Sequence, residues 1–124
     1  MHHFEKLIFW QKSMLLTKQI YIFCQEINAD EKFGLISQIK RSAISIPSNI
    51  AEGSGRNSDK EFSHFLAIAL GSAFELQTQL ILVKELNLLS EDKTNQLLQQ
   101  LTEIQKMIYS FKNDNLNKTP NPKS

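Results

Sequence analysis

Apolar residues recur every three or four positions along four long stretches of this chain, which is the period of one face of an α-helix. The stretches cover roughly residues 4–27, 30–53, 59–86 and 91–111. Only four glycines and three prolines interrupt the 124 residues, and no alternating pattern typical of β-strands competes. The sequence therefore predicts an all-α protein.

Helix-capping residues mark where several of these helices begin. Residues 58–61 have the capping-box form, in which a serine hydroxyl and a glutamate three residues later satisfy exposed backbone amides. Ser90 precedes two carboxylates, and Asp30 is a third candidate cap. Because joints of a few residues separate helices of about 25 residues, we expect an antiparallel up-down-up-down four-helix bundle over residues 1–112. Residues 113–124 lose the periodicity, and we expect a disordered C-terminal tail there.

The sequence also predicts which side of the first helix is buried and where the second helix bends. In the first stretch a heptad-like stripe is expected to face the core; it comprises Leu7, Met14 and Tyr21 with their neighbours Ile8, Leu15 and Ile22. In the second stretch Pro47 removes one backbone hydrogen bond, so we expect a kink in helix 2 and a freed carbonyl near residue 43. The hydroxyls of Ser45 or Ser48 could supply the missing partner.

The overall charge excludes binding to nucleic acid or anionic membrane through bulk charge, since 14 basic and 13 acidic residues leave a net charge of +1. The single cysteine, Cys24, excludes an internal disulfide framework and a multi-cysteine zinc site, and we interpret it as a small apolar helix residue. No signal peptide and no run of about 18 apolar residues is present. We therefore expect a cytoplasmic protein with no membrane partner.

The second helix carries an unusual polar face, which we call the helix-2 ridge. Serine and asparagine are weak helix formers whose short side chains let another surface approach. Both arginines of the chain lie on this ridge, and residues 32–56 carry a net charge of +3 against −2 for residues 58–87. The ridge comprises Gln38, Arg41, Ser45, Ser48, Asn49, Glu52 and Arg56.

The third helix has an apolar arc wider than one stripe, because Leu70, Phe74 and Ile81 form a shoulder beside the core line. A monomeric bundle would expose this shoulder, which predicts self-association, although helices 2 and 4 could instead cover it. Glu75, the one carboxylate in the middle of this helix, is a candidate partner for Arg41 or Arg56 within the subunit or across an interface.

The block QIKRSAISIPSNIAEGSGR at residues 38–56, with LAIA at 66–69 and GSAFEL at 71–76, resembles the bacterial four-helix bundle family of 23S rRNA intervening-sequence proteins. The resemblance covers roughly residues 4–111. It implies a ring-shaped homopentamer around a central channel. It also implies nucleic-acid binding through basic residues, since the related accessory variability proteins of diversity-generating retroelements work with a reverse transcriptase. The family's basic positions correspond to Lys40, Arg41 and Arg56.

Three functions follow as hypotheses. In the first, a non-catalytic oligomer binds the backbone of RNA or DNA, with Lys40, Arg41 and Arg56 contacting phosphates and Ser45 and Asn49 allowing close approach. In the second, the ridge is a subunit interface of a protein-interaction scaffold. A di-metal enzyme, suggested by Glu61-x-x-His64, is disfavoured because such sites need two copies of the motif. We therefore expect no catalysis, no metal and no cofactor.

Overall fold

The computed structural model describes residues 2–28 and 32–117. The described residues form four α-helices and no strand: α1 (Ile8–Cys24), α2 (Ser37–Ser54), α3 (Asp59–Glu85) and α4 (Glu91–Asn117). A short 3₁₀ turn, η1 (Phe4–Lys6), precedes α1, and a single turn of π-helix, η3 (Lys32–Ile36), leads into α2. The predicted all-α architecture is confirmed.

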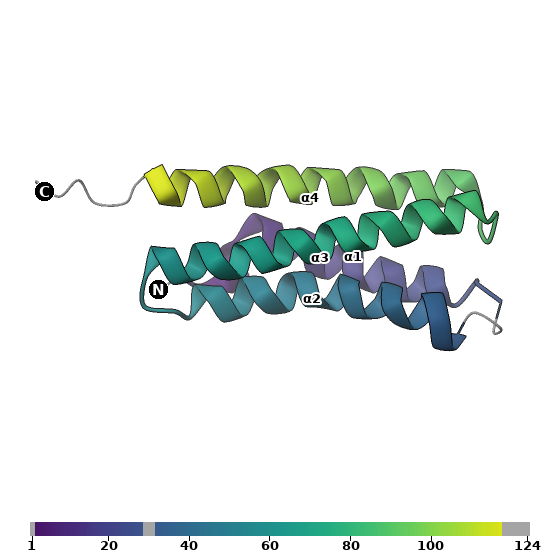
Figure 1. The fold of residues 1–124 in the computed structure, drawn as a ribbon, viewed down its shortest axis with the longest axis horizontal. Coiled ribbons are helices and arrows are strands. Elements are labelled where there is room, and N and C mark those ends of the chain that lie inside the picture. The colour runs from purple at the N-terminus through teal and green to yellow at the C-terminus, as the bar shows by residue number, and fades with distance from the viewer. Residues whose placement is uncertain (1, 29–31, 118–124) are drawn as a thin grey trace, which may run out of the picture.

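The four helices lie side by side, and Figure 1 shows consecutive helices joined by short connections at alternating ends of the molecule. Each helix packs against the next one along the chain, and α4 closes the arrangement against α1. These contacts are those of a four-helix bundle.

The core is built from one apolar stripe of each helix. The fully buried side chains include Leu16 and Ile20 on α1, and Leu101, Ile104 and Ile108 on α4. Eight residues of α3 are buried, and seven of them recur at alternating intervals of four and three residues, which is the pattern of a single seam: Phe62, Ser63, Leu66, Ala69, Ala73, Leu76, Leu80 and Val83.

The prediction of which α1 residues face the core was wrong by about one position along the helix. Met14, Leu15, Tyr21 and Ile22 are exposed, whereas Phe9, Leu16 and Phe23 enter the core. Apolar residues occur all around α1, so the sequence pattern did not single out the buried side, and packing against α2 and α4 selects it.

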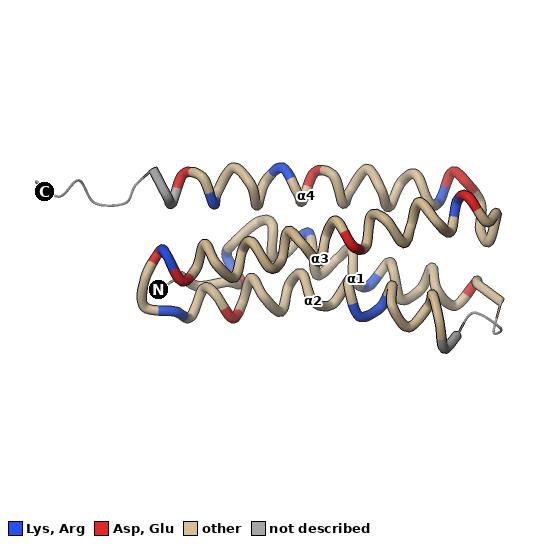
Figure 2. Tube along the Cα trace, in the orientation of Figure 1, with Lys and Arg blue, Asp and Glu red and all other residues tan. Residues whose placement is uncertain are grey.

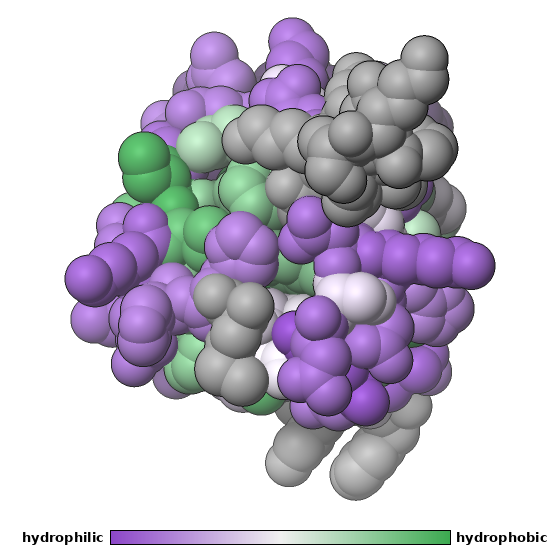
Figure 3. Space-filling view, turned by 90° about the vertical axis from the view of Figure 1, so that its left-hand side faces the viewer, coloured by the Kyte–Doolittle hydropathy of each residue, from purple (hydrophilic) through white to green (hydrophobic). Residues whose placement is uncertain are grey.

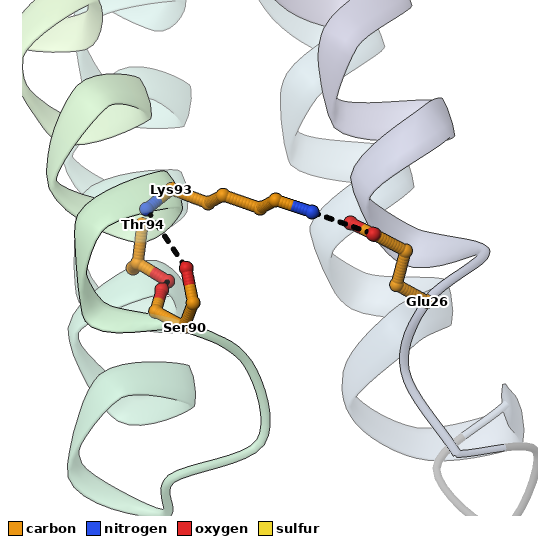
Figure 4. A network of polar contacts seen from close by, with 4 residues as sticks. All are labelled: Glu26, Ser90, Lys93 and Thr94. Atoms are coloured by element: carbon orange, nitrogen blue, oxygen red, sulfur yellow. Dashed lines mark hydrogen bonds and ion pairs between the residues drawn. The ribbon is translucent and has the colours of Figure 1, made fainter.

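The caps expected for α3 and α4 are confirmed. The Ser58 hydroxyl accepts a hydrogen bond from the Glu61 amide at 3.1 Å, and the Ser90 hydroxyl accepts one from the Lys93 amide at 3.1 Å. Figure 4 shows that Lys93 also reaches from α4 toward α1, where its ammonium lies 2.7 Å from a carboxylate oxygen of Glu26. The candidate cap Asp30 lies outside the described residues.

The end of α4 was predicted too early. The helix continues to Asn117, into the segment that was expected to form the tail, and extending an existing helix requires no new nucleation. The remainder of the expected tail, residues 118–124, lies outside the described part of the chain.

Helix α2 continues as an α-helix through Pro47, which is buried. The carbonyl oxygen of Ala43, four residues earlier, is the one that Pro47 deprives of an amide partner. The Thr17 hydroxyl of α1 lies 3.2 Å from this oxygen and 2.7 Å from the carbonyl oxygen of Ser13. The replacement partner therefore comes from the neighbouring helix, and the assignment of this role to Ser45 or Ser48 was wrong.

Gly53 lies where α2 packs closely against α3. A Cβ atom added to Gly53 would lie 2.6 Å from the Phe65 Cβ atom, so the absence of a side chain allows α2 and α3 to approach closely near their connection.

Cys24 is buried, and burial raises the pKa of its thiol to about 11, with the nearby Lys40 ammonium acting in the opposite direction. Cys24 is thus the small apolar residue expected from the sequence.

Among the described helices, α3 has the length and composition of a membrane-crossing segment, with a mean hydropathy of 1.6 over its most apolar 18-residue window. Core helices of soluble proteins pass the same test, and the buried residues of α3 form part of the bundle core. Only 33% of that window is buried, so much of the apolar surface of α3 faces outward.

Candidate nucleic-acid interface between α2 and α3

A shallow groove of about 430 Å³ runs between the middle of α2 and the middle of α3. Two residues of the helix-2 ridge line its α2 side, and four residues of α3 line the other. The lining residues are Arg41, Ser45, Ile68, Gly71, Ser72 and Glu75. We call it the Arg41 groove.

Hydroxyl groups from the two helices meet beside this groove. The Ser45 and Ser72 hydroxyl oxygens lie 2.8 Å apart, and the Asn49 side-chain amide donates to the Ser45 hydroxyl at 2.9 Å and to its carbonyl at 2.8 Å. Ser45 and Asn49 are half-buried. This part of the helix-2 ridge therefore packs along α3, and its short side chains serve the approach of α3 to α2.

Arg41 is the cationic residue of the groove. Its side chain is exposed and donates a hydrogen bond to the side-chain carbonyl of Gln38, one turn earlier. Glu75 lines the same groove, but no ion pair within 4.0 Å joins Arg41 to this or any other acidic residue in the described part of the chain. Arg41 thus retains donors for an anionic ligand, while Glu75 offsets part of its charge.

Arg56 has a different environment. Its guanidinium pairs with Glu52, four residues earlier, at 2.5 Å, and lies 4.7 Å from the centre of the Phe65 ring. The ion pair and the stacking contact engage both the charge and one face of the guanidinium. Glu75 is therefore not its partner within the subunit.

Lys40 points away from the Arg41 groove. Its ammonium lies 5.1 Å from the centre of the Tyr21 ring of α1, on the opposite flank of α2. The structure thus separates the basic residues that adjoin in sequence. Figure 2 shows that charged positions are few along α2 and α3 between the ends of these helices.

The candidate interface residues of α3 lie mostly at the surface. Phe74 is 54% exposed, Ile81 is 42% exposed and Glu75 is exposed, whereas Leu70 is half-buried against the core. A Cβ atom added to Gly71 would meet no atom within 4 Å, so the chain at this point faces open space. The outward face of α3 is therefore apolar and accessible.

A second apolar surface, which was not predicted from the sequence, lies along the line where α1 meets α4. Ile8, Leu15 and Ile22 are 56%, 53% and 54% exposed, and each lines one of three consecutive grooves between these helices. The spacing of seven residues was visible in the sequence, but it was interpreted as a buried stripe. We call this surface the α1–α4 seam.

Glu61 and His64, the two residues of the Glu61-x-x-His64 motif, contact neighbouring residues at the start of α3. The Glu61 amide and carboxylate both contact Ser58 in the capping box, and the His64 ring lies beside Phe65. Within residues 2–28 and 32–117, no group of three or more histidine, cysteine, aspartate or glutamate side chains is placed to hold a metal ion.

Comparison with known proteins agrees with this architecture. The family model described as 23S rRNA-intervening sequence protein matches residues 5–110. A crystal structure of a protein of unknown function from the S23 ribosomal protein family of Bacteroides thetaiotaomicron is 28% identical, with a TM-score of 0.79. The match covers 84% of this chain and 97% of that one. No curated protein matches the chain. Because the family model spans most of the sequence, the chain belongs to the 23S rRNA-intervening sequence protein family.

Proposed function

We propose that this protein is a non-catalytic, cytoplasmic, antiparallel four-helix bundle that self-associates and binds the backbone of nucleic acid through the Arg41 groove. The observation that carries the proposal is the state of Arg41, an exposed guanidinium that forms no ion pair among the described residues, in a groove that Ser45 and Ser72 also line. A guanidinium with free donors suits a phosphate group, which it can contact through two parallel hydrogen bonds.

The surroundings of Arg41 favour close approach of a phosphate. Gly71 presents no side chain, and one hydroxyl of the hydrogen-bonded pair Ser45 and Ser72 keeps a proton that it can donate to a phosphate oxygen. The groove is lined by no aromatic ring on which a base could stack, so we expect contacts to the backbone with little sequence preference. The name of the matched family, which refers to an intervening sequence of 23S rRNA, makes structured RNA the first ligand to test.

One groove carries a single free arginine, so a monomer would bind weakly. Self-association would repeat the groove in every subunit, and phosphate contacts made together by several subunits strengthen binding through counterion release. A ring, such as the pentamer implied by the family resemblance, would place the grooves at regular intervals. The exposed apolar residues Phe74 and Ile81 support self-association, because a surface of this kind is stabilised when another subunit covers it.

Fluorescence anisotropy with a labelled RNA hairpin and a labelled single strand, across a series of salt concentrations, tests the proposal. We expect affinity that falls steeply with salt, and a reduced salt slope in the Arg41→Ala variant. Lys18→Ala is the matched control, since Lys18 is an exposed cation on α1 that does not line the groove. Affinity weaker than about 10⁻⁴ M at low salt for both ligands would refute nucleic-acid binding.

The alternative is a protein-interaction scaffold in which the helix-2 ridge docks onto a neighbouring subunit. The presence of Glu75 beside Arg41 favours it, because across an interface these residues could pair with their counterparts in the next subunit. Light scattering on Arg41→Ala separates the two functions. Loss of the oligomer supports the scaffold, whereas an intact oligomer with lost RNA binding supports the nucleic-acid interface.

A further inference from the structure

The α1–α4 seam is an open apolar channel along one side of the bundle. The groove around Ile8 measures about 570 Å³ and the one around Ile22 about 300 Å³, and a smaller groove of about 60 Å³ lies at Leu15. Gln100 lines both the groove at Ile22 and the groove at Leu15, so these two grooves adjoin. Figure 3 shows apolar surface in a hollow between hydrophilic side chains at the end of the molecule where α1 begins.

In the two grooves at Leu15 and Ile22, the charged residues that line the channel are paired across it. Lys12 of α1 lies 3.0 Å from Glu103 of α4, and Glu26 lies 2.7 Å from Lys93. These ion pairs leave an apolar strip with little unbalanced charge between Leu15 and Ile22. The groove around Ile8 is also lined by Lys6, Lys106 and Asp114, which form no ion pair within 4.0 Å among the described residues. A surface that covers this strip would therefore have to be apolar and nearly uncharged.

The outward face of α3 has these properties. Ala67, Phe74 and Ile81 are exposed at intervals of seven residues, the same spacing as Ile8, Leu15 and Ile22. Each row therefore spans about 21 Å at the helical rise of about 1.5 Å per residue. Glu75 is the one Asp, Glu, Lys or Arg between residues 62 and 83, and only 33% of the most apolar window of α3 is buried in the bundle.

We infer that the α1–α4 seam of one subunit receives the Ala67–Phe74–Ile81 row of α3 from a second copy of this chain. The inference rests on the self-association in the proposed function, and it adds the surface against which α3 packs. The two rows match in length, in spacing and in apolar character. Equal heptad spacing allows the side chains of one helix to interdigitate with those of a helix pair.

This contact is head-to-tail, because the two surfaces that meet belong to different helices. After the first contact forms, one subunit still has an unused α3 row and the other still has an unused seam. Such heterologous contacts add further subunits until the assembly closes as a ring or continues as a filament. An α3-to-α3 contact would instead stop at a dimer.

Size-exclusion chromatography with multi-angle light scattering on four proteins tests the inference. Leu15→Glu places a charge in the seam, Phe74→Glu places one in the α3 row, and Met14→Glu is the control. Met14 is an exposed α1 residue of similar character that lines none of the three grooves. Ile22→Glu serves as a second seam variant if Leu15→Glu shows a changed circular dichroism spectrum.

The wild type and Met14→Glu are expected to be oligomers of the same mass, and each of the other two variants is expected to be a monomer. An equimolar mixture of Leu15→Glu and Phe74→Glu is expected to form a dimer, because the intact α3 row of one fits the intact seam of the other. A monomeric wild type, an oligomeric seam variant, or a mixture that stays monomeric would overturn the inference. RNA binding that is absent in an intact oligomer would refute the proposed function and leave this inference standing.

Discussion

The Thr17 hydroxyl of α1 lies 3.2 Å from the carbonyl oxygen of Ala43 in α2, the oxygen that loses its helical amide partner. The proline responsible, Pro47, lies within the residues that the family model matches, and α2 continues as a helix through it. A side chain of the adjacent helix thus compensates a defect in the backbone of α2. The hydroxyl has one proton to share between this oxygen and that of Ser13, so the contribution is modest.

We predict that Thr17→Val lowers the free energy of unfolding by about 1 kcal/mol, the usual value for one such hydrogen bond. In the background of Pro47→Ala, which restores the amide of residue 47, the same substitution should cost less. Thr102→Val is the control, since the Thr102 hydroxyl bonds only the Leu98 carbonyl of its own helix. Equal costs of Thr17→Val in both backgrounds, measured by urea denaturation, would show that the two residues are not coupled.

The two helical glycines beside the α2–α3 contact should respond oppositely to the same substitution. Gly53→Ala places a Cβ atom 2.6 Å from that of Phe65 and 2.9 Å from Cδ1 of Phe62, and should destabilise the protein by about 1–3 kcal/mol. Gly71→Ala meets no atom within 4 Å and should stabilise α3 by up to about 1 kcal/mol. Thermal denaturation of both variants provides the measurement, and a stable Gly53→Ala variant would contradict the close approach.

Cys24 should react slowly with thiol reagents in the folded protein. Burial raises the pKa of its thiol from 9.0 to about 11, so the reactive thiolate at pH 8 is about a hundredfold scarcer than for an ordinary cysteine. The thiol stays protonated until the pH approaches 11, and the stability that follows from its raised pKa is present below pH 9 and decreases between pH 9 and 11. Reaction with a chromogenic disulfide should be fast only after denaturation; rapid labelling of the native protein would disprove this.

Removing Glu52 should strengthen nucleic-acid binding. Glu52 pairs with Arg56, and the Glu52→Gln variant would free the Arg56 guanidinium and raise the net charge by one per subunit. We expect tighter RNA binding and a steeper salt dependence than in the wild type. Glu103→Gln, which frees Lys12 in the α1–α4 seam, is the charge-matched control. Equal effects of both variants on RNA affinity would indicate that net charge, and not the position of the arginine, controls binding.

The sequence predicted well those features that depend on neighbouring residues along the chain. The Ser58 and Ser90 caps follow from local hydrogen bonding, and the helices follow from the apolar period. It predicted poorly what depends on which helix lies beside which. The core side of α1 could not be chosen from a helix with apolar residues all around, and only the packed bundle shows that Leu16 is buried and Leu15 exposed.

The candidate site shows the same division. The polar character of the helix-2 ridge and the small residues Gly71 and Ser72 were evident in the sequence, and the structure brings Ser45 and Ser72 together. The sequence could not show that Lys40 turns toward Tyr21 of α1, because Lys40 and Arg41 are adjacent basic residues that no sequence pattern distinguishes. The partner of Arg56, by contrast, is Glu52, which lies one turn away at a spacing that favours ion pairs on a helix.

Photo-crosslinking tests the central claim most directly. The protein would be irradiated with a 4-thiouridine-containing RNA hairpin, and mass spectrometry would identify the crosslinked peptides. If RNA binds in the Arg41 groove, crosslinks should fall within residues 38–49 of α2 and 68–75 of α3, the segments that border the groove, and should be lost in Arg41→Ala. Crosslinks confined to α1 and α4, or unchanged in Arg41→Ala, would contradict it.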